Sequence, residues 1–455
     1  MGDIVPNPGP TRSSISDSVR EETEAHAESE IRIPYRKLYV SHFFRTWGDR
    51  LFEFGAALFI IDVFKTTLLE SSLYGLLTTG IGLLFGDIMG KWVDKSPRIA
   101  VVKYLIPIQK LTIILSHVGF WALLTYFDPG IENKPMDKRA FVVFSIVVLL
   151  GGLYKVTTIG MNVALERDWI VALAAGNSSS LTSLNATLRR IDLLCKMLAP
   201  LFVALLTSTA STLVAVYFIA AWNVASLVIE YFCILTVYNS SPILSVPKPV
   251  LREANEASGY LGNSRWQDLK YCVTSPLILA TLSYAMLFLT VLSMGGTMIA
   301  YMVAKQYSDP VISGIRAVCV VAGLAATFIS PILTRRLGLI RGGLWSIWSQ
   351  VFCLLPVVLA FYINDGAGIT STVLLFLEGA PNDRAGLISG FQYSLCNAFD
   401  MLAYATTIIW SSPDLFYIPA TISFAMVAFA AIVFTVYVKQ QRGHVIHAKR
   451  LFKSL

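Results

Sequence analysis

The chain has 455 residues, of which 55% are hydrophobic and 14% charged, and its mean hydropathy is +0.63. A soluble domain of this length cannot bury so much apolar surface, so the composition indicates a polytopic membrane protein. The net charge of +7 does not indicate nucleic-acid binding, because the basic residues cluster at the ends of apolar segments. We therefore expect the lipid bilayer as a partner and no nucleic acid.

The N-terminal segment is polar. Residues 1–37 are acid-rich and contain no apolar run. A cleavable signal peptide needs an apolar core of about 7–15 residues, so none is expected here. We predict a disordered cytosolic tail over residues 1–37.

Apolar runs that could cross a ~30 Å hydrocarbon core recur along almost the whole chain. Eleven helical spans are predicted, over 43–63, 71–90, 101–126, 140–163, 191–210, 212–236, 275–303, 311–333, 344–362, 386–410 and 415–438. They form two halves, 38–238 and 273–438, joined by a polar cytosolic loop over 239–272. The predicted fold is all-α and similar to the major-facilitator plan of two six-helix halves, with the substrate path between them.

The second half is one span short of that plan. Between Asn364 and Asp383 the only apolar stretch is Ile369–Leu377, which as a helix is about 13 Å long. With eleven spans the tail over 439–455 would lie outside the cell, yet its five basic residues favour the cytosol. The simplest resolution is that one helix is missing after Phe376, through a gene-model error or a splice variant.

Charged loops mark the cytosolic side. Basic residues after the second, fourth and eighth spans place these loops and the N-terminus in the cytosol. The loop after the second span contains Asp94 and Arg98, and its counterpart in the second half is Thr334–Arg341. These loops either form charge pairs that close the cytosolic side or are ordinary basic loops.

The densest charge lies between the fourth and fifth spans. Charge at the edge of a bilayer is costly unless it is paired or functional. Six charges fall within 27 residues, namely Glu166, Arg167, Asp168, Arg189, Arg190 and Asp192.

Other reactive residue types carry little information. The six cysteines are scattered without a CxxC pair, which predicts helix packing and neither a disulfide frame nor a thiolate metal site. None of the five histidines fits a site, although His117 would be an intramembrane polar group and His42 lies at a span edge. No motif resembles an enzyme's nucleophile, phosphate loop or zinc site, so we expect no enzymatic activity and no cofactor.

Several long motifs are similar to the ferroportin family of iron exporters. They include Trp47-Gly48-Asp49-Arg50, the ERDWIV segment 166–171 and the NATLRRID segment 185–192. Matches continue in order from about Leu38 to Val438. The resemblance implies export of ferrous iron, often with other divalent metals, in exchange for protons.

The resemblance also implies a metal site in the first half. The family pairs the Asp of its WGDR motif with a His four residues later, and these positions are Asp49 and Glu53 here. The i, i+4 spacing places both carboxylates on one helix face. They could bind a hard divalent cation, or Arg50 could neutralise them structurally.

The family's second site uses a Cys and a His, whose positions are Gly296 and Ala403 in this chain. Neither side chain can bind metal, which leaves Asp400, one turn before Ala403, as the metal candidate of that half, or as a helix-packing residue. The Cys position is also associated with a regulatory peptide hormone in animal family members. We therefore expect no such regulation here.

Further departures concern the cavity of the first half and the gate. Gln109 matches the family, whereas Lys110 and Lys196 stand where the family usually has Asn. The two lysines either lie beside a bound metal or act as internal counter-charges in place of the metal. In the second case the family's secondary Ca²⁺ site would be lost. Asp383-Arg384 is shifted by one residue from the family's acid–base pair. The candidate gating residues are Asp94, Arg98, Arg167, Asp168 and Arg384.

The sequence thus predicts a monomeric carrier that exports Fe²⁺, as substrate and not as cofactor, by alternating access across the plasma membrane in preference to the vacuolar membrane. One alternative is a non-transporting protein of the same family, either truncated or regulatory. A carrier for an organic cation is a third interpretation, which the carboxylates fit but the family motifs do not.

Overall fold

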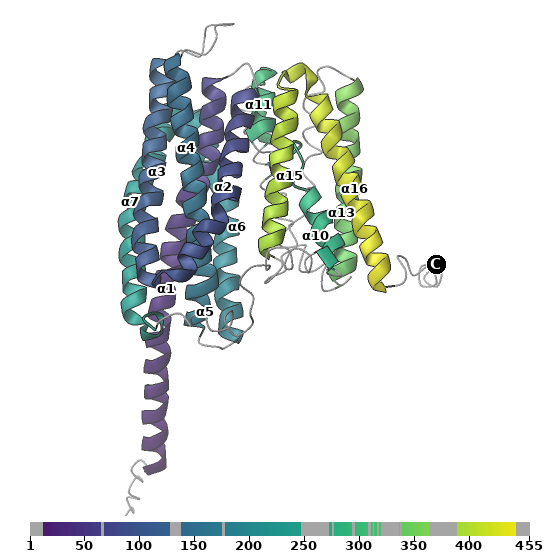
Figure 1. Ribbon diagram of the computed structural model, residues 1–455. Helices are drawn as coiled ribbons and strands as arrows, with labels where there is room; N and C mark the ends of the chain where they lie inside the picture. Colours follow the sequence, from purple (N-terminus) through teal and green to yellow (C-terminus); the bar gives the residue numbers. More distant parts are fainter. Residues whose placement is uncertain are drawn as a thin grey trace, which may run out of the picture.

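Helices account for nearly all of the residues that the computed structural model describes (Figure 1). The described residues are 12–64, 68–127, 138–174, 178–246, 273–274, 277–293, 296–307, 311–312, 314–315, 318–319, 336, 339–363 and 389–442. Side chains are described from residue 35 onward, apart from a few positions within the helices. Several predictions fall outside these residues, including the span over 311–333 for the most part, the short stretch Ile369–Leu377 and Arg384.

The first half is a bundle of long helices. Its elements are α1 (Arg12–Val63), α2 (Leu69–Lys95), α3 (Arg98–Tyr126), α4 (Lys138–Asn162), η1 (Val163–Trp169), α5 (Ile170–Leu173), α6 (Ser178–Thr209), α7 (Thr212–Ser240) and η2 (Pro242–Leu244). The second half contains α10 (Ile278–Met286), α11 (Gly296–Ala304), α13 (Leu339–Ile363), α15 (Ser389–Ile409), η4 (Pro413–Leu415) and α16 (Tyr417–Arg442). Figure 1 shows the two groups side by side.

Hydropathy supports a membrane location. Among the described residues, seven helical stretches are long and apolar enough to cross a bilayer: Leu69–Lys95, Arg98–Tyr126, Lys138–Leu173, Ser183–Thr209, Thr212–Ser240, Ile340–Leu359 and Pro413–Gln440. A buried apolar cluster with members on α1, α3, α7, α11, α13 and α16 extends through both halves. The protein is an all-helical, multi-pass membrane protein.

The N-terminal segment differs from the predicted disordered tail over 1–37. Helix α1 begins at Arg12 and continues without interruption to Val63, so that its first part extends beyond the bundle (Figure 1). Glu, Ala and Arg are strong helix formers, and the helix that α1 forms inside the bundle supplies a nucleus from which they can extend. Acid-rich composition alone therefore did not distinguish a polar helix from a disordered tail.

The ERDWIV segment is also helical, although the sequence suggested a loop after the fourth span. Helix α4 passes into a π-helical turn, η1, which contains Glu166, Arg167 and Asp168, and then into α5. A π-turn inserts one extra residue per turn and re-aims the side chains that follow it. Here it turns Asp168 toward the start of α3, where Arg98 lies.

The predicted span over 275–303 is broken. Helix α10 ends at Met286 and α11 begins at Gly296. Backbone groups released by such a break must find partners inside a membrane protein, and the amide of Val291 donates to Ser423 Oγ of α16 at 2.9 Å. The Gly295-Gly296 pair in the sequence is the signal for this break.

The two halves meet through α2 and α15, toward the upper end of Figure 1. Ser72 Oγ lies 2.7 Å from Thr407 Oγ1, and the amide of Leu68 donates to the carbonyl of Ser411 at 3.3 Å. One turn further along α2, a Cβ at Gly75 would lie 2.5 Å from the ring of Tyr404, so glycine permits the close approach. The halves are therefore packed together at this end.

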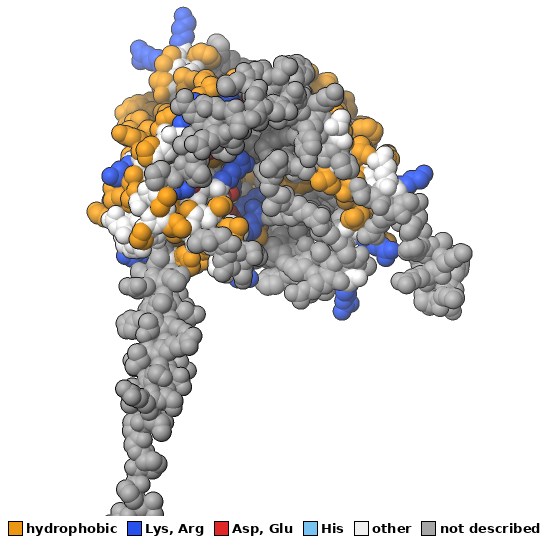
Figure 2. All heavy atoms as spheres, turned by 60° about the horizontal axis from the view of Figure 1, so that its bottom comes forward, with side chains coloured by type: hydrophobic (Ala, Val, Ile, Leu, Met, Phe, Trp, Pro, Cys, Tyr) orange, Lys and Arg blue, Asp and Glu red, His pale blue; other side chains and the backbone are white. Residues whose placement is uncertain are grey.

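The opposite end is hollowed. Figure 2 turns the lower end of Figure 1 forward and shows basic side chains with a small acidic patch inside a hollow near the middle of that face. The two halves are thus packed together at one end and separated by a hollow at the other (Figure 1, Figure 2). The open side is the end at which α1 enters the bundle (Figure 1).

The packing of α2 against α15 can be tested with a disulfide. We expect a Ser72→Cys/Thr407→Cys variant to form an intramolecular disulfide on mild oxidation, because the two replaced oxygens lie 2.7 Å apart. A protease site inserted in the central loop would then yield two fragments that stay linked until reduction. The single variant Ser72→Cys is the control and should yield separate fragments. Separate fragments from the double variant would contradict the packing of the two halves.

Candidate functional site

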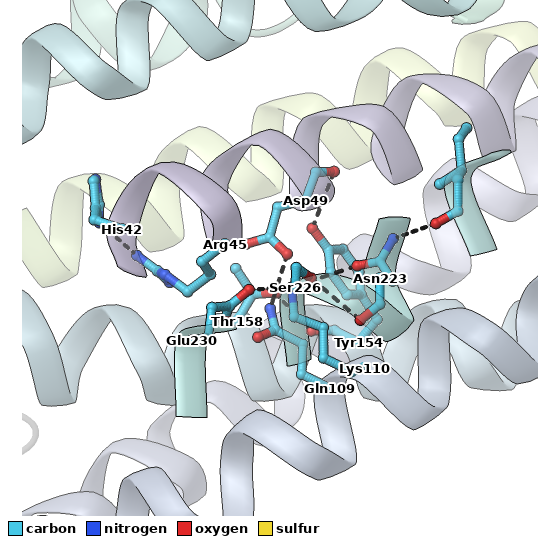
Figure 3. A network of polar contacts seen from close by, with 11 residues as sticks. His42, Arg45, Asp49, Gln109, Lys110, Tyr154, Thr158, Asn223, Ser226 and Glu230 are labelled. Carbon is cyan, nitrogen blue, oxygen red and sulfur yellow. Dashed lines mark hydrogen bonds and ion pairs between the residues drawn. The ribbon is translucent and has the colours of Figure 1, made fainter. Parts of the chain in front are cut away.

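One face of α1 carries polar side chains into the bundle. His42, Arg45 and Asp49 are spaced i, i+3 and i+7, which places them in a row along the helix, and all three are buried. Figure 3 shows them in this order, facing polar residues of α3, α4 and α7. Because these groups lie within an apolar bundle, each needs a partner or a function.

Asp49 is held by α3 and α4. Gln109 donates its side-chain amide to Asp49 Oδ1 at 3.1 Å and to Thr158 Oγ1 at 3.0 Å (Figure 3). The hydroxyl of Tyr154 donates to the backbone carbonyl of Asp49 at 3.4 Å. The other amide atom, Gln109 Oε1, is buried without a hydrogen-bond partner. The site therefore combines a buried carboxylate with an unused oxygen acceptor beside it.

Lys110 is neutralised by an acid on α7. Its Nζ lies 2.6 Å from Glu230 Oε1, and the two side chains are 0% and 1% exposed. The ammonium also donates to Asn223 Oδ1 at 3.4 Å. Lys110 is thus paired with Glu230, whereas the sequence interpretation had given it Asp49 and Glu53 as partners. The sequence contains Glu230 within an apolar run, which is the signal that could have identified it.

Glu53 and Asp49 have different partners. Arg50 Nη1 lies 2.6 Å from Glu53 Oε2, and each of the two side chains is 34% exposed. Arg50 therefore neutralises Glu53, as one of the two interpretations of these acids proposed. Lys155 and the exposed Lys196 also interact electrostatically with Glu53. Lys196 therefore acts electrostatically on Glu53 and is not among the charges that act most strongly on Asp49.

Asp400 of α15 faces the first half. It interacts electrostatically with Lys155 of α4, which also interacts with Glu53. One turn later in α15, Ala403 is buried in the apolar cluster that both halves share. Gly296 lies against α1, where a Cβ would be 3.0 Å from the Cβ of Ala57. The small residues Gly296 and Ala403 therefore contribute to helix packing. Asp400 is the acidic residue in this part of α15.

Metal-binding groups do not gather into a closed cluster. Among the residues that the structure describes, no three His, Cys, Asp or Glu side chains converge as a metal site. Asp49, Glu53 and Asp400 lie on two elements and each has a separate neighbour, namely Gln109, Arg50 and Lys155 respectively.

The gating candidates lie at the open end. Arg98, at the start of α3, donates to Asp168 Oδ1 of η1 at 2.7 Å and to the carbonyl of Val246 at 2.7 Å. Asp94 and Arg167 are exposed near this pair. The contact joins three segments of the first half. Of the basic segment Thr334–Arg341 only residue 336 and residues 339–341 are described, with Arg341 exposed.

Two histidines are better defined by the structure than by the sequence. His117 is buried, its Nδ1 lies 2.8 Å from the carbonyl of Ile113, and its ring packs near Phe52 and Phe59. It is a core residue. His42 has an acidic partner instead, because its Nε2 lies 3.0 Å from Asp192 Oδ1 on α6. The sequence placed His42 only at a span edge, whereas the structure gives it an acidic partner.

Removing the charge of Lys110 should be strongly destabilising. In Lys110→Met, Glu230 is left buried and unpaired, and we expect a loss of about 3–5 kcal/mol, read as a lowered Tm in detergent. The double variant Lys110→Met/Glu230→Leu should recover much of this, since no charge remains buried. Lys103→Met, at an exposed position on the same helix, is the control. Equal Tm values for Lys110→Met and Lys103→Met would contradict the role of the pair.

Comparison with known proteins shows the family to which the chain belongs. The model of the family described as Ferroportin1 (FPN1) matches residues 34–379 and 369–427 of the chain. The two matched pieces meet at 369–379, where the sequence predicts a shortened span. "Solute carrier family 40 member 1" of Oryza sativa subsp. japonica is 30% identical, over 92% of this chain and 94% of the relative. "Ferroportin" of Rattus norvegicus is 27% identical, over 72% of this chain and 64% of the relative.

Solved structures share the fold. The structure described as "a bacterial homologue of iron transporter ferroportin in inward-facing state" superimposes with a TM-score of 0.70 at 24% identity, covering 89% of this chain and 98% of the other. A D-xylose-proton symporter gives a TM-score of 0.58 at 15% identity, with 90% and 99% covered. These likenesses confirm the predicted major-facilitator-like fold. By the extent of the family match and by the rice relative, the chain belongs to the ferroportin family.

Proposed function

We propose that the chain exports divalent iron from the cytosol by alternating access, with Asp49 as the principal ligand of the ion. The observation that carries the proposal is the buried Asp49 carboxylate beside Gln109, whose Oε1 has no hydrogen-bond partner. The relatives named ferroportin support iron as the substrate. Transport by a membrane carrier is the activity that membership of the family indicates.

The ion site is assembled from oxygen ligands. Rotation of the Gln109 amide would turn Oε1 toward the Asp49 carboxylate and create two oxygen ligands on α1 and α3. Oxygen ligands suit hard divalent ions, and ferrous iron accepts them at modest affinity. Modest affinity is useful to a carrier, because an ion that is held by few protein ligands can also leave.

Glu53 and Asp400 are proposed as later contacts on the path between the halves. Both interact electrostatically with Lys155 of α4. A divalent cation that reached either carboxylate would displace Lys155 or Arg50. Gln109 would act as a ligand, whereas Lys110 and Lys196 would set the charge of the cavity.

Two contacts correspond to two gates. Packing of α2 against α15 closes the upper end, where Ser72 meets Thr407. At the open end the charges of Asp94, Arg98, Arg167 and Asp168 are already placed on the first half, with Arg98 joined to Asp168. Closure of this end would bring them toward the basic segment 334–341 of the second half. The basic loops of the open end favour a cytosolic location for it, and the plasma membrane is the proposed location.

Two observations bear on the non-transporting alternative. Glu53 is already paired with Arg50, and the family match divides at residues 369–379. A chain with an incomplete second half could keep its fold and lose transport. Flux measurements decide between the two functions.

Radio-iron efflux from loaded cells tests the proposal. We expect Asp49→Asn to lower efflux at least tenfold, because the amide cannot neutralise a divalent ion. Asp87→Asn is the matched control, since Asp87 is an exposed acid paired with Lys91 on α2, and it should leave efflux unchanged. Surface labelling of each variant separates loss of transport from loss of trafficking.

Efflux by the wild type that Asp49→Asn does not alter would contradict the proposed ligand. A wild-type chain that reaches the membrane and moves no iron would support the non-transporting alternative. Asp400→Asn should reduce efflux less than Asp49→Asn does, because Asp400 acts later on the path.

A further inference from the structure

A polar cluster at the open end of α1 is not used by the transport site. His42 is buried, and its two ring nitrogens have different partners. Nε2 lies 3.0 Å from Asp192 Oδ1, whereas Nδ1 lies 3.3 Å from Arg45 Nη2. Arg45 is held on its other side by Asn162 Oδ1, at 2.9 Å from Nη1. The imidazole therefore connects an acid on α6 to a guanidinium on α1.

These partners determine the protonation state of His42. A guanidinium has only donors, so Nδ1 of His42 must be the acceptor of the bond from Arg45. The imidazole is then neutral, with its proton on Nε2, which donates to Asp192. A second proton can be added only at Nδ1. It would remove the acceptor from Arg45 and place a positive charge next to the guanidinium.

The charged groups around His42 have opposite effects on its protonated form. Asp192 on α6 and Glu166 on η1 both interact electrostatically with His42 and favour its charged form. Arg45 on α1 opposes that form, and Arg189 on α6 interacts with Glu166 from further out. Protonation of His42 is therefore accommodated by the acids only if Arg45 moves away from Nδ1.

Displacement of Arg45 affects the ion site. Arg45 and Asp49 are one turn apart on α1, and Arg45 interacts electrostatically with both Asp49 and Glu230. Figure 3 shows Arg45 between His42 and the Asp49 network. Arg45 also interacts electrostatically with Glu166 and Asp192, but these two acids would neutralise the new charge of a protonated His42. Lys110 already neutralises Glu230, so Asp49 is the carboxylate toward which the displaced guanidinium can turn. A guanidinium on Asp49 excludes a cation from it.

We propose that His42 is a proton-binding site, and that Arg45 transmits its protonation to Asp49, so that a proton on His42 and a cation on Asp49 exclude each other. The exchange of one for the other at the open end would couple inward proton movement to outward cation movement. The proton site stands on the geometry of the cluster, and only the identity of the cation rests on the proposed function. His42 thus has a role that its position at a span edge did not suggest.

The proton site is tested without any transport. In the full chain labelled with ¹⁵N-histidine and held in nanodiscs, His42→Gln identifies the signal of His42. At pH 8 we expect the neutral form with the proton on Nε2, and at pH 5 the doubly protonated form. A proton on Nδ1 at pH 8, or a neutral ring that persists at pH 5, would overturn the proton site.

The coupling is tested by counting protons. Calorimetry of Co²⁺ binding at pH 6, repeated in buffers of different ionisation enthalpy, gives the number of protons released per ion bound. We expect the wild type to release about one proton more than His42→Gln. Arg45→Gln should release as few protons as His42→Gln although its His42 still titrates by NMR, and Arg45→Lys should restore part of the difference. His444→Gln, in the C-terminal tail, is the matched histidine control.

The outcomes separate the two proposals. Equal proton release from the wild type, His42→Gln and Arg45→Gln would overturn the relay while leaving Co²⁺ binding, and with it the proposed function, intact. Wild-type protein that binds no Co²⁺ would contradict the proposed function and the cation half of the relay together, and the NMR experiment would still decide whether His42 is a proton site.

Discussion

Charge inside an apolar bundle must be neutralised, and this constraint organises the first half of the protein. A buried ammonium or carboxylate costs several kcal/mol unless it has a partner. Lys110 therefore joins α3 to α7 through Glu230, and Asp49 joins α1 to α3 through Gln109. Because Lys110 is committed to Glu230, Asp49 has no ammonium of its own at hydrogen-bond distance among the described side chains, and its carboxylate is available to a cation.

The same constraint explains how the carrier can be open at one end. Hydroxyl contacts and small residues between α2 and α15 close the upper end, such as the contact of Ser72 with Thr407. The open end instead carries charge pairs that lie within the first half, such as Arg98 with Asp168. Hydroxyl contacts and small residues can separate at little cost, whereas the exposed charges of the open end, such as Asp94 and Arg167, can exchange partners. The two ends are thus built for opposite kinds of closure.

Sequence patterns predicted local features better than distant partners. The choice of Asp49 and Gln109 and the approximate places of the first-half spans follow from motifs and apolar runs, because both are properties of neighbouring residues. The partner of Lys110 could not be predicted, since Glu230 lies on another helix and only packing brings them together. The same is true of His42 and Asp192, which are 150 residues apart. The broken helix was missed because the apolar run outweighed Gly295-Gly296, and the Ser423 hydroxyl that satisfies Val291 is remote in sequence.

The most direct test of the account is to locate a bound ion. Crystals of the full chain soaked with Co²⁺ and measured at the cobalt absorption edge would show the metal by its anomalous signal. The account predicts one peak beside the Asp49 carboxylate, with Gln109 turned so that Oε1 faces it and the Lys110–Glu230 pair unchanged. A peak that replaces Lys110 at Glu230, or no peak near Asp49 in protein that transports the ion, would contradict it.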